Sequence, residues 1–174
     1  MRATAALLVL LAACATSDSI EKQSAKLGGY AYEAPASWHG ADTREPRSVT
    51  TSWAPSAEDN AHKESLVVIR TQLDPALAKA GVPEVERLLI AAQRELPHLH
   101  LAGATTKFVT DKGLTALRLD SEFVPPGLTA TYHRTHVALL DGTTLIHLIY
   151  TTTDLSTEGQ ALVLVLQSIH RGEG

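Results

Sequence analysis

Cysteine is almost absent from this sequence, since Cys14 is the one cysteine among 174 residues. No internal disulfide can form, so the fold must be stabilised by the burial of apolar side chains. A strong charge of one sign is lacking as well, with a formal net charge of −4 and a sequence pI near 6.0. Because nucleic-acid-binding domains usually present a basic surface, we expect no nucleic-acid partner.

Sequence motifs of common catalytic sites are also lacking. The chain contains no Gly-x-Ser-x-Gly nucleophile motif, no His-Glu-x-x-His metal motif and no glycine-rich phosphate loop. We therefore expect a protein that is not an enzyme and that holds no cofactor.

The N-terminal residues form a targeting signal. Arg2 precedes the uninterrupted apolar and small residues Ala5–Ala13, which are fewer than half of the roughly 20 that a helix needs to cross a bilayer. The run fits the short apolar region of a secretory signal. Its end, Leu11-Ala12-Ala13-Cys14, resembles the bacterial lipobox, in which a peptidase cuts before a lipidated cysteine. The alternative is an ordinary secreted protein whose signal ends near a cysteine.

The lipobox resemblance implies a location. We predict that residues 1–13 are a lipoprotein signal peptide and that Cys14 carries fatty acyl chains, such as palmitate, that hold the protein on a membrane of the cell envelope. In well-studied Gram-negative bacteria, Asp directly after the cysteine retains a lipoprotein in the inner membrane. Ala15 stands there in this chain, which favours the outer membrane, on its periplasmic side or its surface.

The rest of the chain has the composition of one globular domain, with 44% hydrophobic and 20% charged residues. Residues 14–27 are polar and small, without a sustained apolar period, which indicates a flexible tether after the lipidated cysteine. The pair Gly28-Gly29 then opens the domain, which we place at residues 28–174.

Alternation and turn signals predict an α+β fold. We expect strands at residues 30–35, 48–53, 65–71, 105–110, 113–123, 129–140 and 143–153. We also expect a helical turn capped by Asp74, a helix over residues 83–96, and a closing helix over residues 156–170 capped by Ser156. This order predicts an antiparallel sheet of about six to seven strands with helices packed on it.

The same order resembles the PsbP-like fold, which the photosystem II extrinsic protein shares with bacterial DcrB-type lipoproteins. The resemblance rests on the long helix after the third strand and on four local features: Pro35–Trp38, the strand from Gly113, the Asp141-Gly142 hairpin, and the helix end at Ser168-Ile169. It covers most of residues 28–170 and implies an α/β/α sandwich that binds other proteins. It implies no catalytic site, and no functional residue can be transferred from it.

The Asp141-Gly142 pair is typical of a two-residue hairpin turn. If both residues are central in the turn, Leu140 lies opposite Thr143 and His136 lies opposite His147. Opposed side chains have Cβ atoms about 5 Å apart, close enough for two imidazoles to share a metal or to titrate together. Zinc takes three or four ligands, however, and no carboxylate falls in register beside the pair. We therefore predict a hydrogen-bonded pair and keep both histidines only as weak candidate metal ligands.

The same register separates two faces of the sheet. The histidine face is otherwise mainly apolar. The opposite face is apolar at one end and polar at the other, where it carries Arg118, Asp120, His133 and Tyr150. This polar end is a candidate groove for a ligand or partner, with Arg118 and His133 as donors. The alternative is a solvated end of the sheet.

Two classes of function remain open. The first is a lipid-anchored, non-catalytic binding or scaffold domain for another envelope protein, which predicts an exposed apolar patch. The second is a small-molecule or lipid binder, or a metal-dependent enzyme that uses its histidines, which predicts a closed pocket with convergent polar groups.

Overall fold

The structure is a computed structural model that describes residues 20–55, 64–96, 98–154 and 159–172. Within these ranges the chain forms eleven strands and three helices, arranged as antiparallel sheets with helices packed on them. The predicted α+β fold class is therefore confirmed. The signal peptide, Cys14 and the Ser156 cap lie outside the described residues. None of the described helices is long and apolar enough to cross a bilayer.

Eight strands form the main sheet, in the order β3-β4-β5-β10-β9-β8-β6, with β7 also paired to β8. This sheet is larger than predicted because β3 and β6 gave no apolar signal in the sequence. The bounds are β3 (His39–Arg44), β4 (Ser48–Ala54), β5 (Glu64–Gln72), β6 (His100–Leu101), β7 (Thr106–Val109), β8 (Thr115–Phe123), β9 (Tyr132–Asp141) and β10 (Thr144–Thr152).

A second, three-stranded sheet consists of β1 (Lys22–Leu27), β2 (Tyr30–Pro35) and β11 (His170–Arg171), in the order β1-β2-β11. The prediction that residues 14–27 are a tether is therefore wrong for its last six residues. Leu27 is fully buried, and the Gln23 side chain donates to the carbonyl oxygens of Pro35 and Trp38 at 2.7 Å each. The domain thus begins before residue 28.

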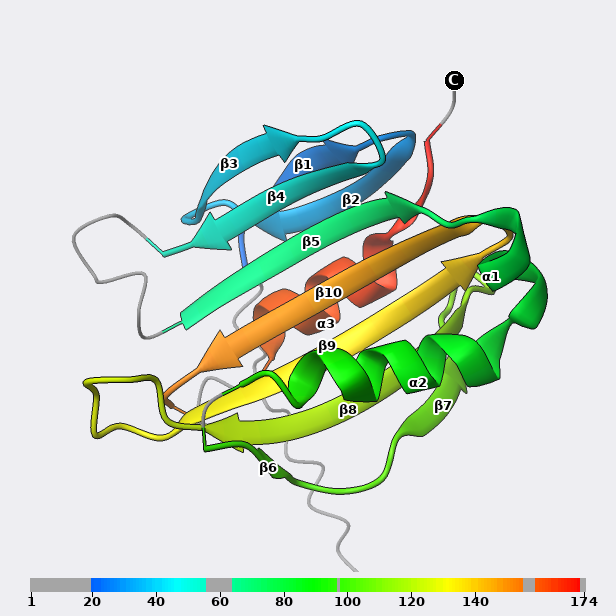
Figure 1. Ribbon diagram of the computed structural model, residues 1–174. Coiled ribbons are helices and arrows are strands. Elements are labelled where there is room, and N and C mark those ends of the chain that lie inside the picture. The colour runs from blue at the N-terminus through cyan, green and yellow to red at the C-terminus, as the bar shows by residue number, and fades with distance from the viewer. Residues whose placement is uncertain (1–19, 56–63, 97, 155–158, 173–174) are drawn as a thin grey trace, which may run out of the picture.

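The helices lie on opposite faces of the main sheet. The short helix α1 (Pro75–Ala80) is capped by Asp74 as predicted, since the Asp74 carboxylate accepts from the Ala76 N–H, and Gly81 connects it to α2 (Val82–Gln93). In Figure 1, α2 crosses the near face over β8 and β9, whereas α3 (Gln160–Ser168) and the small sheet lie behind the main sheet.

Two apolar clusters fill the spaces between these layers. The larger one joins α3, the small sheet and the main sheet, and it contains both tryptophans, Trp38 and Trp53. The smaller one lies under α2 and includes Val85, Leu89 and Leu119. The faces of the sheet are sorted as the sequence predicted, because Leu117, Leu119, Ala138 and Leu145 of the histidine face lie in the smaller cluster.

The register of the β9–β10 hairpin differs from the prediction. Asp141 pairs with Thr144, so Gly142 and Thr143 are the two central residues of the turn, and Gly142 has a φ of +60°. His136 therefore lies opposite Ile149, and His147 lies opposite Ala138. Moving the turn by one residue shifts the pairing by two, which leaves every side chain on its predicted face.

Candidate functional site

A groove lies between α3 and the polar end of the main sheet, and we call it the α3 groove. Its volume is about 270 Å³. Strands β8, β9 and β10 supply its floor, and α3 supplies an apolar wall. It is lined by Arg118, His133, Thr135, Tyr150, Thr152, Gly159, Leu162, Val163 and Leu166.

Strand register brings the predicted residues together. Thr135 on β9 lies opposite Asp120 on β8 and opposite Tyr150 on β10, so these three side chains form one row across the sheet. Arg118 and His133 lie on the same face, and both line the groove. Asp120 instead lines an adjoining depression of about 250 Å³, which shares Arg118 and His133 with the groove.

The polar side chains at this end of the sheet are paired with one another. Both carboxylate oxygens of Asp120 accept from Arg118 Nε, at 3.0 and 2.9 Å, and Oδ1 also accepts from Thr135 Oγ1 at 2.6 Å. On the neighbouring strands, His133 Nδ1 lies 3.2 Å from Glu122 Oε1. These contacts fix the positions of the side chains that border the groove.

Sequence reasoning missed the apolar part of the groove. Val163 is 47% exposed and lines the wall formed by α3, beside the partly buried Leu166. Val163 lies outside the buried stripe of α3, which includes Leu162 and Val165. The sequence signal that could have revealed this wall is a large apolar residue on the solvent-facing side of the helix.

The histidine pair lies on the other face of the sheet, under α2. His136 Nε2 and His147 Nδ1 are 2.9 Å apart, so the two rings are hydrogen-bonded diagonally across the hairpin, although they are not directly opposed. His136 Nδ1 is 2.8 Å from Gln93 Nε2, and Gln93 Oε1 accepts from Ser121 Oγ at 3.1 Å. We call these four side chains the buried polar chain. Gln93 and Ser121 were not predicted, although Gln93 is four residues after the buried Leu89.

Burial determines the charge of this pair. Desolvation lowers the pKa of His136 to about 3, and the nearby His147 and Arg134 add to the effect. Desolvation likewise lowers the pKa of His147 to about 4. Both imidazoles are therefore neutral near pH 7. Among the described residues, no group of three or more His, Cys, Asp or Glu side chains lies close enough to hold a metal ion.

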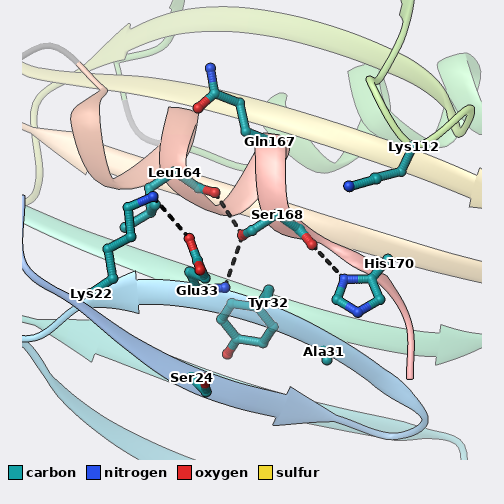
Figure 2. Close-up of a pocket in the computed structure, with 10 residues that line it drawn as sticks. All are labelled: Lys22, Ser24, Ala31, Tyr32, Glu33, Lys112, Leu164, Gln167, Ser168 and His170. Atoms are coloured by element: carbon teal, nitrogen blue, oxygen red, sulfur yellow. Dashed lines mark hydrogen bonds and ion pairs between the residues drawn. The ribbon is translucent and has the colours of Figure 1, made fainter. Parts of the chain in front are cut away.

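A separate hollow of about 400 Å³ lies between the small sheet and the end of α3 (Figure 2). Ser168 joins the two elements, because its Oγ donates to the Leu164 carbonyl oxygen at 2.7 Å and accepts from the Glu33 N–H at 2.8 Å. Glu33 also pairs with Lys22 at 3.1 Å. These contacts attach α3 to β2, so we assign the polar groups of this hollow to the fold.

Comparisons with solved structures identify the fold. CyanoP, the cyanobacterial PsbP of Synechocystis sp. PCC 6803, is similar with a TM-score of 0.62 and 17% identity over 93% of this chain and 99% of that chain. PA94, a protein of unknown function from Pseudomonas aeruginosa, has a TM-score of 0.51 and 18% identity over 88% of this chain and 99% of its own. LpqN, involved in cell envelope biogenesis of Mycobacterium tuberculosis, has a TM-score of 0.47 and 14% identity over 88% and 86% of the two chains.

These identities show the fold alone, and that fold is PsbP-like, as the sequence predicted. No protein-family model and no curated protein matches the chain.

Proposed function

We propose that this chain is a lipid-anchored, non-catalytic binding domain of the bacterial envelope, which docks another envelope protein in the α3 groove. Two features support the proposal at a coarse level: the lipobox that ends at Cys14, and a PsbP-like fold similar to that of CyanoP. The anchor would be lasting if Cys14 carries more than one acyl chain, since a single chain gives only marginal membrane binding.

The observation that carries the proposal is the composition of the α3 groove. Val163 and Leu166 form an apolar side, and Arg118 and His133 form a polar side. Such a combination of apolar and polar contacts is typical of protein interfaces, where an apolar centre is bordered by polar groups. Val163 is one of three exposed large hydrophobic side chains among the described residues, and of these three it alone lines the groove.

The shape of the groove favours a protein over a small molecule. Small-molecule sites usually enclose most of the ligand surface. The α3 groove is a surface feature of about 270 Å³ with an exposed valine on its wall. A protein partner supplies its own cover for such a surface, whereas a bound lipid or metabolite would keep much of its surface in water.

Site-specific photo-crosslinking in cells of the source bacterium tests the groove. A photoreactive amino acid at Val163 should give one dominant crosslinked envelope protein. The same substitution at Val109, which is 63% exposed on β7, is the matched control and should not give that product. Identical products at both positions, or none at Val163, would contradict docking in the α3 groove. A crosslinked lipid or metabolite at Val163 would favour the second class of function.

Mass spectrometry of the mature protein tests the anchor separately. We expect a chain that begins at Cys14 and carries acyl groups. Replacing the cysteine, as Cys14→Ser, should leave the protein out of the membrane fraction. An unmodified thiol on a freely soluble mature protein would contradict the anchor while leaving the groove untouched.

A further inference from the structure

The buried polar chain links α2 to the sheet. Three residues of α2 are buried, namely Val85, Leu89 and Gln93, and one of them is polar. Gln93 is 2% exposed, and it forms hydrogen bonds with Ser121 and His136. Below Val85 and Leu89 lies the apolar face of the sheet, on which the partly buried Val82 and Ile90 of α2 also pack, and Gln93 adds a polar contact.

Each hydrogen bond of the buried polar chain has one donor and one acceptor that the geometry assigns. Because Ser121 Oγ donates to Gln93 Oε1, the Gln93 amide nitrogen faces His136 and donates to its Nδ1. His136 must then carry its proton on Nε2, which donates to His147 Nδ1. His147 in turn carries its proton on Nε2. A second proton on either ring would therefore place two donors opposite each other in a buried site.

The surroundings offer little compensation for an added positive charge. Arg134, on the same face of β9, is the charged side chain that acts on His136, and it is itself a cation. Around the pair, β8 supplies Leu119 and Ser121, β10 supplies Ile149, and β5 supplies Ile69. On α2, Glu86 is half-buried, and Arg94, which follows Gln93, is exposed.

We propose that α2 is an acid-released cover of the sheet: protonation of His136 and His147 favours a state in which α2 has detached and the apolar face under it is open to solvent. In the closed state His136 is buried, His147 is partly buried, and both imidazoles are neutral. In the open state each can take up a proton in water. Acid therefore shifts the population toward the open state, without any need for protonation of the closed one.

The size of the shift follows from proton linkage. If each histidine regains its ordinary pKa of 6.5 in the open state, lowering the pH from 7.5 to 5.0 favours that state about 30-fold per histidine and roughly 900-fold for both. Because the pKa of both rings is low in the closed state, the closed form takes up almost no protons between pH 7.5 and 5.0.

Hydrogen exchange of the backbone amides measures this opening directly. In the full chain, amides of α2 should exchange through an opening that costs less free energy than the opening of β9 and β10. After correction for the intrinsic exchange rate, the α2 opening constant should rise by several hundred-fold between pH 7.5 and 5.0. Equal protection of α2 and of β9 and β10 would show that α2 opens only with the whole domain, and this would overturn the proposal.

A neutral replacement separates protonation from packing. Glutamine at position 136 keeps an acceptor for Gln93 and a donor for His147, but it cannot be protonated, so His136→Gln should reduce the pH effect to about 30-fold. The exposed His39 on β3 provides the control, and His39→Gln should leave the full effect. An unchanged pH effect in His136→Gln would overturn the proposal. If that variant does not fold, His147→Gln gives the same test. If neither folds, a pH effect below about 30-fold in the unmodified chain overturns it.

Discussion

Asp141 joins three segments that are far apart in the sequence. Its carboxylate accepts from Tyr30 Oη at 2.7 Å and from Arg171 Nε and Nη2 at 2.6 Å each. The residue ends β9, whereas Tyr30 begins β2 and Arg171 ends β11. These bonds also explain the hairpin register, because Asp141 is held at the end of the strand and Gly142 becomes the first residue of the turn.

We expect Asp141→Asn to destabilise the domain by about 1 kcal/mol, since a charge-assisted pair is replaced by weaker bonds and solvent already screens the exposed Arg171. Arg171 lowers the pKa of Asp141, so this contribution is present above the ordinary carboxyl pKa of 3.8 and is lost as the pH falls below it. Urea unfolding at pH 7 and pH 3 measures both effects. The exposed pair Glu84–Arg87 is the control, and a loss in Glu84→Gln as large as in Asp141→Asn would contradict the assignment.

Gly40 is required by a close contact with a tryptophan. A Cβ atom on this residue would lie 2.9 Å from ring atoms of Trp53, which is opposite it on β4 and 7% exposed. We expect Gly40→Ala to cost about 1–3 kcal/mol, because the buried ring must shift. In Gly103→Ala the new Cβ meets nothing within 4 Å. Thermal unfolding of the two variants should differ accordingly, and equal melting temperatures would show that β3 moves aside freely.

At the level of elements, amphipathic segments could be predicted and polar strands could not. The helix before β6 and strands β8, β9 and β10 were identified because their apolar side chains recur at the spacing of a helix or a strand. Strand β3 is exposed at all six residues, and β1 exposes its lysines while its buried end is a single leucine. Their structure depends on pairing with β4 and β2, which no local pattern reveals.

The candidate site was likewise predicted in part. Arg118, His133 and Tyr150 could be placed on one face, because a shift of the register by two residues leaves each side chain on the same face of the sheet. The groove could not be predicted, because it forms only where α3 packs over that face, and the packing of α3 depends on contacts with distant parts of the chain. Gln93 was missed because a polar residue on an apolar helix face is normally read as solvent-exposed, and its partners Ser121 and His136 come from other elements.

Strand β1 gives a direct test of where the domain begins. Leu27 is fully buried, whereas its neighbour Lys26 is exposed. We expect Leu27→Ala to destabilise the domain by about 2–4 kcal/mol, as for other large-to-small changes in a core, and Lys26→Ala to have little effect. Chemical denaturation of both variants shows whether this segment is a paired strand of the domain or a flexible tether. A tether would tolerate both changes equally.

For the whole molecule, the two faces of the main sheet differ in how they respond to acid. The face covered by α3 and the small sheet is held mainly by apolar residues, including Leu66, Val137 and Ile146. The face under α2 contains the buried His136 and the partly buried His147. Because both have a lower pKa in the folded chain than the ordinary value of 6.5, the unfolded chain binds more protons between that value and about 4.

The free energy of unfolding should therefore be largest above about pH 6.5 and should fall as the pH drops from there toward 4 and 3. Each histidine contributes a slope of up to about 1.4 kcal/mol per pH unit. Urea unfolding between pH 7.5 and 4.5 measures the slope.

Carboxylates add their own pH dependence, so the decisive quantity is the difference between the unmodified chain and the His136→Gln/His147→Gln double variant. That variant should be flatter by up to about 2.7 kcal/mol per pH unit, while His39→Gln should retain the full slope. Parallel curves for the unmodified chain and the double variant would contradict the lowered pKa of the two histidines in the folded chain.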